Sequence, residues 1–309
     1  MERRRLVRLA GCLALALGLA ACGETEKTVV PPAGNPFEAA KVGTDTTLEV
    51  MTWNIENFPK AGATTVNDVR QIIEGVQPDI VAVEEIANGA SFEQLDAQLA
   101  GWAGTHASSD SYQNLGFLYR VDGGLAVTSV YEIFTSDSRA FPRAPYVLEA
   151  TWNGTPFVVI ANHLKASGDG VMNTSDPYDE ETRRRDACVL LADFVATSLA
   201  GQRVFIVGDM NDILTDVEAN NVFEVFLQDP ADWRFADLAI AQGPAGGFSY
   251  PNYNSHLDHI LVTSALFPAL DAPGTLVTTM SNLPAILGGW ASYDRDVSDH
   301  LPVIVRLVP

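Results

Sequence analysis

Two short apolar runs on either side of a long helical pattern constrain the fold of this chain most. Residues 157–160 and 204–207 are continuous apolar segments, with the length and composition typical of strands buried on both faces. Between them, the pattern over residues 179–199 predicts a long helix. An earlier pair of strand patterns, at 48–55 and 78–83, also encloses apolar residues at helical spacing. Strands that alternate with helices in this way predict an α/β fold.

The first residues have the features of an export signal. Four arginines precede the apolar stretch 9–21, which is too short to cross a membrane. Residues 19–23 read Leu-Ala-Ala-Cys-Gly and resemble a bacterial lipobox, in which the cysteine becomes the lipidated first residue of the mature protein. We therefore expect residues 1–21 to be a lipoprotein signal peptide, and acyl chains on Cys22 to hold the exported protein at the cell envelope. The residue after Cys22 is Gly23 and not the aspartate that is linked to retention in the inner membrane, which favours the outer membrane. The alternative is an ordinary signal peptide in which the cysteine has no role.

The rest of the chain divides into a tether and one domain. Residues 22–44 contain prolines and glycines but few bulky apolar side chains, so we expect a flexible tether. Residues 45–309 contain no second linker or internal repeat, which predicts a single domain, expected to be a monomer. An intramolecular disulfide is not expected, because Cys12 leaves with the signal, Cys22 is lipidated and only Cys188 remains. Cys188 lies in a helical pattern and is expected to pack as a small apolar residue.

The charge of the chain limits how it can hold a substrate. The net charge is −20, and loss of the signal, with four arginines and one glutamate, would make it about −23. Such a protein has no general electrostatic affinity for nucleic acid. A nucleic-acid or phospholipid substrate would have to be held locally, by a metal and a few basic side chains. Solubility explains most of the acidity.

Polar residues gather at the ends of strand-like runs, in six segments along the chain. These segments are 51–55, 77–85, 162–164, 207–211, 257–261 and 298–302. In content and order they resemble the metal-dependent endonuclease/exonuclease/phosphatase superfamily, which includes deoxyribonuclease-like, sphingomyelinase-like and inositol-phosphatase-like enzymes. The resemblance implies a four-layer α/β/β/α sandwich, in which helices flank two packed mixed β-sheets. It covers the chain from about Leu48 to Val308.

The same resemblance implies a metal shell of hard oxygen ligands. Glu85 occupies the place of the family's metal-binding glutamate, and Asn54 and Asp299 would complete the shell or orient its waters. Magnesium, or manganese in its place, usually takes one or two carboxylates and keeps several waters. Glu84 replaces the glutamine often found before the metal-binding glutamate. Because side chains alternate along a strand, only one of Glu84 and Glu85 should point at the metal.

The remaining motif residues would carry the reaction. By resemblance, Asp209 positions or deprotonates the attacking water, and Asn211 donates a hydrogen bond to the phosphate. His163 and His300 would stabilise charge that builds on the pentacoordinate phosphorus. Asp258 would fix the tautomer of His300 and raise its basicity. Histidine–carboxylate pairs of this kind are typical of hydrolytic sites.

Several other polar residues have weaker support from the sequence. Asp212 is interpreted as a loop or cap residue that follows the Asp209 motif. His259 should face away from Asp258 and serve packing or the surface, and His256 and His106 match no motif. We assign none of these residues to the site.

Basic residues near the motifs are candidates for binding a substrate phosphate. They are Lys165, beside His163, and one of Arg183, Arg184 and Arg185, which follow a polar loop at the start of the long helical pattern. A solvated helix face is the alternative for the arginines. One segment departs from the family: residues 143–145 read Arg-Ala-Pro, where deoxyribonuclease-like members carry a glutamate that supports the first catalytic histidine. Ala144 therefore weakens a strict deoxyribonuclease assignment.

Taken together, the motifs predict an exported phosphoric ester hydrolase, most consistent with a phosphodiesterase that uses in-line attack by a metal-organised water. Extracellular nucleic acid is favoured over phospholipid as substrate. Trp102, Phe141 and Trp290 could line a stacking groove for bases or an apolar lip for lipid, although most of them are expected in the core. A sphingomyelinase-like or inositol-phosphate phosphoesterase stays open. So does a non-catalytic surface lipoprotein that keeps the fold, although binding alone would not need so many converging polar residues.

Overall fold

The computed structural model describes residues 34–108 and 112–308. The expected signal peptide and the expected lipidation site, Cys22, lie outside these residues. Within the described part of the chain, no helix combines the length and apolar character that a membrane span requires.

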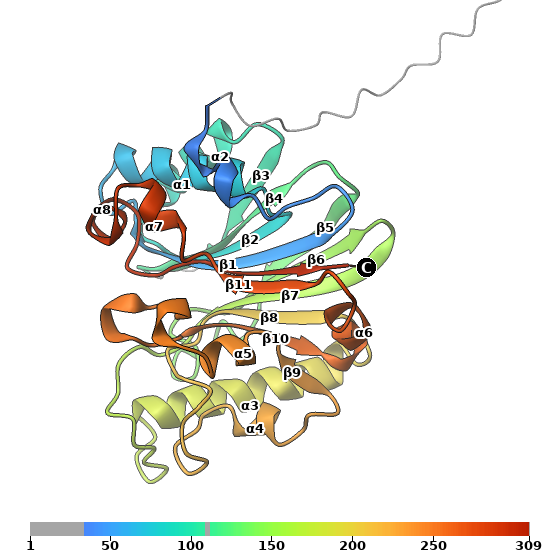
Figure 1. The fold of residues 1–309 in the computed structure, drawn as a ribbon. Coiled ribbons are helices and arrows are strands. Elements are labelled where there is room, and N and C mark those ends of the chain that lie inside the picture. Colours follow the sequence, from blue (N-terminus) through green and yellow to red (C-terminus); the bar gives the residue numbers. More distant parts are fainter. Residues whose placement is uncertain (1–33, 109–111, 309) are drawn as a thin grey trace, which may run out of the picture.

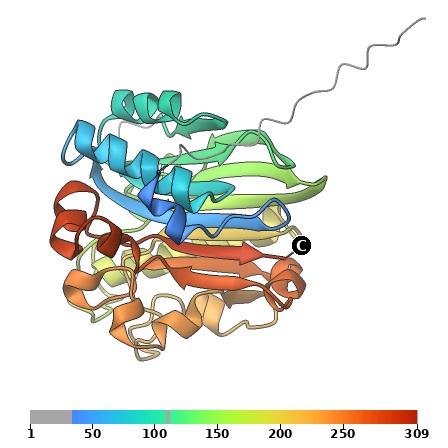
Figure 2. The same ribbon diagram turned by 45° about the horizontal axis from the view of Figure 1, so that its top comes forward.

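Two mixed sheets, each of six strands in the described ranges, pack face to face between outer layers of helices (Figure 1; Figure 2). The strand order is β11-β12-β1-β2-β4-β3 in the first sheet and β5-β6-β7-β8-β10-β9 in the second. β1 pairs with β2, and β7 with β8, in parallel, whereas the other neighbours are antiparallel. The strands of the first sheet are β1 (Leu48–Phe58), β2 (Ile80–Ile86), β3 (Trp102–His106), β4 (Asn114–Arg120), β11 (Leu276–Thr279) and β12 (Val303–Leu307). Those of the second are β5 (Leu125–Glu132), β6 (Tyr146–Trp152), β7 (Thr155–His163), β8 (Val204–Asp209), β9 (Trp233–Phe235) and β10 (Asp258–Thr263).

Helices cover the outer face of each sheet. The first sheet is covered by α1 (Ala63–Val76), α2 (Gly89–Gln98), α7 (Leu283–Ile286) and α8 (Trp290–Asp296). The second is covered by α3 (Glu180–Ser198), α4 (Glu224–Leu227) and α5 (Leu238–Ala241). Shorter elements are α6 (Phe267–Leu270), η1 (Pro36–Ala40), η2 (Ala245–Gly247), η3 (Pro251–Tyr253) and η4 (Ser264–Leu266). This is the four-layer α/β sandwich that the sequence predicted.

Burial on both faces explains the continuous apolar strands. In β8, Val204 and Ile206 join the cluster under α3, while Phe205 and Val207 join the cluster between the two sheets. The predicted strands at the motifs and the long helix are confirmed, with β8 at Val204–Asp209 and α3 at Glu180–Ser198. Strands β3, β4, β5, β9 and β11 were not predicted. Cys188 is buried under the second sheet, as expected of a packed apolar residue.

The end of the expected tether is part of the fold, so that prediction is wrong for residues 34–44. Phe37 is 1% exposed and packs in the cluster beneath α1. Asn35 caps η1 through the Phe37 N–H and donates from Nδ2 to the carbonyl of Gln71 at 2.8 Å. Val42 and Gly43 both donate to the carbonyl of Val76. The packed domain therefore begins before the Asp45 boundary inferred from the sequence, because buried apolar side chains and hydrogen bonds to α1 hold the segment.

The aromatic candidates are mostly core residues. Trp102 and Phe141 are buried in the clusters of the first and second sheet, respectively. Trp290 packs against the first cluster, stacks on Tyr293 and donates to the Asn252 side chain at 2.9 Å. Trp102 and Phe141 therefore do not form a groove for bases or lipid.

Candidate active site

The predicted polar residues meet at one edge of the sandwich. Parallel pairing places His163 at the end of β7 opposite Asp209 at the end of β8, and antiparallel β10 places Asp258 opposite the same Asp209. Here a cavity of about 210 Å³ opens between the two sheets. Among the described residues, it is lined by Glu56, Asn57, Glu85, His163, Ala166, Asp209, Asn211, Tyr250, Leu257, Asp299 and His300. Asn54 and Asp258 are buried behind this lining and hydrogen-bond to it.

Backbone irregularities aim several side chains into the cavity. Glu56, Asn57, Glu85 and Asn211 have left-handed φ angles of 38°, 47°, 65° and 54°. The pairing of β1 with β2 shifts register beyond Asn54, where the first two of these residues lie. Such irregularities cluster at functional sites, where a bulge redirects a side chain and the surrounding structure holds the strain.

Glu84 and Glu85 point in different directions, as strand alternation requires. Glu84 is fully buried between the sheets and accepts a hydrogen bond from the Thr52 hydroxyl at 3.0 Å. Burial, with further contributions from Asp258 and Asp209, raises the pKa of Glu84 well above its ordinary value. Glu85 instead lines the cavity and accepts from the backbone N–H of Asn57 at 2.9 Å. Of the two carboxyl groups, only Glu85 is therefore available to a cation.

Asn54 lies where the metal shell was expected but makes different contacts. Its Nδ2 donates to Asp209 Oδ2 at 3.0 Å and to Glu85 Oε1 at 3.3 Å. Its Oδ1 accepts from the backbone N–H of Glu56 at 2.9 Å. Asn54 therefore orients the two carboxylates through its Nδ2. Its Oδ1 has a second lone pair, and its role in the metal shell stays a prediction.

His300 is paired with Asp258, as the sequence suggested. Its Nδ1 lies 2.7 Å from Asp258 Oδ2, and its Nε2 lies 3.7 Å from Asp209 Oδ2. Burial alone would lower the pKa of His300, but the carboxylates of Asp258 and Asp209 outweigh it and raise the pKa to about 10. The ring is therefore an imidazolium at neutral pH. Tyr250 stacks on it with a centroid separation of 4.5 Å.

Asp209 and Asn211 share the end of β8. Asp209 is 2% exposed and accepts from the backbone N–H of Asn211 at 3.0 Å and from Asn54. Burial raises the pKa of Asp209 to about 6, although His300 opposes the rise. Asn211 Nδ2 donates to the Leu164 carbonyl at 3.2 Å, which fixes the amide beside the cavity.

His163 is held differently from His300. It is 2% exposed, and burial, with smaller contributions from Arg143 and His300, lowers its pKa well below the ordinary value, so the ring is neutral. Within the described residues, its Nδ1 has no hydrogen-bond partner. The register of β6 and β7, in which Tyr146 pairs with Ala161, places Ala144 opposite His163. His163 Nδ1 therefore lacks a partner at the position where deoxyribonuclease-like members carry the supporting glutamate and this chain carries Ala144.

Arg143 is a site residue that sequence reasoning did not assign. Its guanidinium donates to the Gln113 side-chain carbonyl. Burial lowers the pKa of Arg143, whereas the Glu85 and Asp209 carboxylates act in the opposite direction, so the cation lies near both. Its place before β6 was noted for the neighbouring Ala144, but nothing in the sequence indicated that the arginine itself lies near Glu85 and Asp209.

The three arginines of α3 do not reach the site, so their assignment as phosphate ligands is wrong. Arg184 is 3% exposed and donates to Asp212 Oδ2 at 2.8 Å. Arg183 donates from Nε to the Arg139 carbonyl at 2.7 Å, and Arg185 pairs with the neighbouring Asp186. Each is occupied by protein groups outside the cavity lining.

Lys165 also faces protein groups. It donates to the carbonyl of Ala166 and lies 3.7 Å from Glu180 Oε1. It is not among the lining residues of the catalytic cavity. Arg143 is also absent from this lining, but unlike Lys165 it interacts electrostatically with two of the lining carboxylates, Glu85 and Asp209.

The carboxylates around the cavity fit a divalent cation. Glu85, Asp299 and Glu56 line it with carboxylate oxygens, the hard donors that magnesium and manganese prefer. Burial, with a further contribution from Glu56, raises the pKa of Asp299 to about 7 even though His300 opposes the rise. A cation bound there would stabilise the ionised form of these carboxylates.

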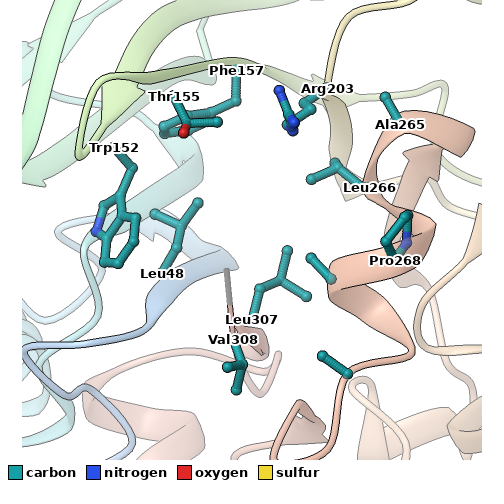
Figure 3. A pocket seen from close by; sticks show the side chains of 12 residues that line it. Leu48, Trp152, Thr155, Phe157, Arg203, Ala265, Leu266, Pro268, Leu307 and Val308 are labelled. Carbon is teal, nitrogen blue, oxygen red and sulfur yellow. The ribbon is translucent and has the colours of Figure 1, made fainter.

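A second cavity lies at the opposite edge of the sandwich (Figure 3). Its volume is about 350 Å³, and its lining combines the start of β1 and the end of β12 with residues after β10. Leu48, Trp152, Phe157 and Leu307 make it largely apolar. No carboxylate or imidazole belongs to the described residues that line it, so this cavity lacks the groups that hydrolysis of a phosphoric ester requires.

Fold and site together define a metal-dependent hydrolase of phosphoric esters. The model of the Endonuclease/Exonuclease/phosphatase family matches residues 51–300, and the chain belongs to this family. No sequence among the curated proteins matches the chain.

Solved structures share the fold at low sequence identity. D. rerio TDP2 complexed with single strand DNA product has 15% identity and a TM-score of 0.60, with 85% of this chain and 99% of that chain covered. The human Nocturnin catalytic domain with bound sulfate has 16% identity and a TM-score of 0.59, over 86% of this chain and 96% of that chain. A Bacteroides thetaiotaomicron mannosyl-6-phosphatase has 14% identity and a TM-score of 0.55, over 85% of this chain and 100% of that chain.

Proposed function

We propose that this protein is an exported phosphodiesterase that cleaves nucleic acid with magnesium or manganese. The observation that carries the proposal is the opposition of two charged groups across one cavity. Asp209, a carboxylate held by Asn54, faces the Asp258-paired imidazolium of His300 at 3.7 Å. A base and a cation at this separation can act on the attacking water and on the phosphate at the same time.

Asp209 is the proposed base. With a pKa raised by burial to about 6, it is mostly ionised at neutral pH and still basic enough to accept a proton from water. Asn54 and the Asn211 backbone N–H hold both of its oxygens, so the carboxylate keeps one orientation. A divalent cation held by Glu85 and Asp299 would supply positive charge that neutralises the phosphate oxygens.

The other side chains stabilise the charge that develops on phosphorus. His300 can donate from Nε2, because its Nδ1 is already bound to Asp258 and the ring is protonated. Arg143 adds a guanidinium near Glu85 and Asp209. Asn211 lies beside the cavity with one amide hydrogen not used by Leu164. Preorganised donors of this kind stabilise a transition state without reorganising during the reaction.

An exposed aromatic pair favours nucleic acid as the substrate. Tyr250 stacks on His300, and Tyr253, which is 72% exposed, stacks on Tyr250 at 5.1 Å with ring planes 16° apart. Tyr250 thus connects the exposed ring of Tyr253 to His300. A base next to the scissile phosphate could stack there, an interaction of about 1–3 kcal/mol per base. The fold is shared with a protein described in complex with single strand DNA product, which is consistent with such a substrate.

We also propose that the protein is lipid-anchored through Cys22 at the bacterial cell envelope, in the outer membrane. The lipobox-like residues 19–23 support this placement. Metabolic labelling with radioactive palmitate tests it: the wild-type protein should incorporate label, and a Cys22→Ser variant should not. Equal labelling of the two proteins would contradict lipidation at this cysteine.

A comparison of substrates tests the proposed activity. Single-stranded oligonucleotides, sphingomyelin vesicles and an inositol phosphate should be incubated with magnesium and with the wild-type or Asp209→Ala protein. The proposal expects release of nucleotide products from the oligonucleotide by the wild type alone. Tyr253→Ala should raise KM for the oligonucleotide and leave hydrolysis of a small diester without a base unchanged. If only the lipid or only the inositol phosphate were hydrolysed, nucleic acid would be ruled out as the substrate. If no substrate were hydrolysed, a non-catalytic protein would be favoured.

A further inference from the structure

A second cluster of buried ionisable groups lies behind the active site. It consists of Asp237, which immediately precedes α5, and of His256 and His259, which flank the start of β10. All three are at most 2% exposed. His256 Nε2 and His259 Nδ1 lie 3.0 and 2.6 Å from the same oxygen, Asp237 Oδ2. The sequence indicated no role for either histidine beyond packing or the surface.

The hydrogen bonds determine where the protons of this cluster are. The backbone N–H of Ser249 donates to His256 Nδ1 at 3.2 Å, so this nitrogen is unprotonated and Nε2 carries the hydrogen that faces Asp237. Both nitrogens of His259 face acceptors, Asp237 Oδ2 and the Asp212 carbonyl at 3.0 Å. Both must therefore carry hydrogens, which makes His259 an imidazolium.

The charges of the cluster are consistent with these protonation states. Burial opposes ionisation, but Asp237 and the Asp212 carbonyl outweigh it and raise the pKa of His259. In return, His259 and His256 lower the pKa of Asp237, although burial alone would raise it. Asp237 and His259 thus form a buried ion pair whose polar atoms are hydrogen-bonded, as such pairs require.

A metal ion does not explain the convergence of these side chains. A histidine binds a metal through an unprotonated ring nitrogen, usually while its other nitrogen donates to a second group. In His256 the arrangement is reversed, because Nδ1 accepts from Ser249 and Nε2 must carry the proton. The cluster is therefore a hydrogen-bonded network.

Ser249 connects the cluster to the catalytic pair. Besides donating to His256, it accepts the backbone N–H groups of Leu257 and Asp258 on its hydroxyl, at 3.1 and 3.2 Å. Its carbonyl accepts the N–H of Leu301, the residue after His300, at 2.7 Å. Burial opposes ionisation of Asp258, but His300, with a smaller contribution from Ser249, lowers its pKa. Among the described residues Asp258 Oδ1 has no hydrogen-bond partner, so the Ser249 hydroxyl acts on Asp258 chiefly by holding its backbone N–H.

The network also reaches the segment that carries the base. His259 binds the carbonyl of Asp212, three positions after Asp209. Asp237 Oδ1 accepts the N–H of Ile260 on β10 at 2.9 Å. One buried cluster thus ties together the ends of β8 and β10 and the turn before β12, which supply Asp209, Asp258 and His300.

We propose that Ser249, Asp237, His256 and His259 are positioning residues that hold the Asp258–His300 pair in register with Asp209. This inference rests on the proposed phosphodiesterase function for its kinetic consequence, but the hydrogen-bond network itself can be tested without turnover. A role in stability alone is the competing explanation. The two differ in whether a folded variant that has lost the Ser249 hydroxyl turns over more slowly.

Steady-state kinetics with bis(4-nitrophenyl) phosphate, a small diester without a base, distinguishes these explanations. For Ser249→Ala, kcat should fall about 10–100-fold, the range typical of residues that orient a catalytic group, with KM within about twofold of the wild-type value. Ser249→Thr keeps the hydroxyl and should recover most of kcat. His106→Gln is the matched control, because His106 lies on edge strand β3 and contacts the Ala107 carbonyl, so kcat should not change. Wild-type kcat in a folded Ser249→Ala protein would overturn the proposal.

Nuclear magnetic resonance of the histidine rings provides a test that does not need activity. At neutral pH, ¹⁵N shifts should show His256 as the neutral tautomer protonated at Nε2 and His259 as protonated on both nitrogens. The His300 Nδ1–H resonance should shift in both Ser249→Ala and Asp237→Asn. If the wild type hydrolyses no diester but these signals are observed, the proposed function fails and the network stands. Unchanged His300 signals in both variants would refute the network.

Discussion

Arg184 gives the sharpest prediction about how the active-site loops are held. Its guanidinium donates to Asp212 at 2.8 Å and to the carbonyls of Lys165 and Ser167 at 2.7 and 2.6 Å, and it lies 3.2 Å from Glu181. It therefore joins the loop after His163 to the loop after Asp209. Arg184→Ala would leave two buried carboxylates without their cation, a loss that costs about 3–5 kcal/mol when one partner of a buried pair is removed.

Urea unfolding followed by circular dichroism measures this loss. Arg185→Ala is the matched control, because Arg185 lies one position away in the same helix and pairs at the surface with Asp186. Its free energy of unfolding should change by less than about 1 kcal/mol. If Arg184→Ala were as stable as Arg185→Ala and instead raised KM for a phosphodiester, Arg184 would be a substrate ligand and the structural reasoning would be refuted.

Three further predictions follow from buried groups and from the cation site. Burial raises the pKa of Glu49 to about 9. Between the ordinary glutamate pKa and pH 9, the folded state therefore binds more protons than the unfolded state. The free energy of unfolding should fall as pH rises through this range, by up to about 1.4 kcal/mol per pH unit. Glu49→Gln should therefore melt at a higher temperature than the wild type at pH 8 but not near pH 4.5, and equal melting temperatures at pH 8 would contradict this. Magnesium should raise the melting temperature of the wild type but not that of Glu85→Gln, because a ligand that binds only the folded state stabilises that state. If magnesium did not raise the melting temperature of the wild type, the cation site would be contradicted. Burial raises the pKa of Cys188, so this thiol should resist iodoacetamide in the folded protein and react in urea, whereas stoichiometric modification without urea would refute its burial.

Much of the fold could be predicted from the sequence, because strands buried on both faces leave a continuous apolar signal. Val204 to Val207 show this signal, with alternate side chains in two different clusters. Shorter and partly exposed strands such as β9 and β11 give no comparable pattern. The packing of Phe37 on α1 was not predicted, because a single apolar residue in a proline- and glycine-rich segment gives no periodic pattern.

In the site, too, residues that belong to local motifs could be predicted, whereas contacts between residues far apart in the sequence could not. Glu85, Asp209 and His300 were assigned because each lies in a motif at the end of a strand, and the structure brings them together at one cavity. The direction of the Asn54 amide depends on a contact with Asp209, which is far away in the sequence. Arg143 is likewise placed by its surroundings, and no local pattern identifies it.

Long-range packing also explains the misassigned basic residues. A run of three arginines is typical of an exposed helix face or a phosphate site, and the sequence cannot show that two acidic partners bury the middle one. Asp212 and Glu181 do so here. His256, just before β10, and His259, within it, show the converse, since the partner of both is Asp237, from another segment.

Nicking of supercoiled plasmid DNA tests whether the cavity around Asp209 and His300 is a metal-dependent phosphodiesterase site. The purified protein should be assayed with magnesium and with a chelator, beside Asp209→Ala and His300→Ala variants whose folding is confirmed by circular dichroism. We expect the wild type to convert the plasmid to open circles with magnesium only, and both variants to lose this conversion. Equal nicking by the wild type and the two folded variants, or nicking that persists in chelator, would contradict the assignment of this cavity as a metal-dependent phosphodiesterase site.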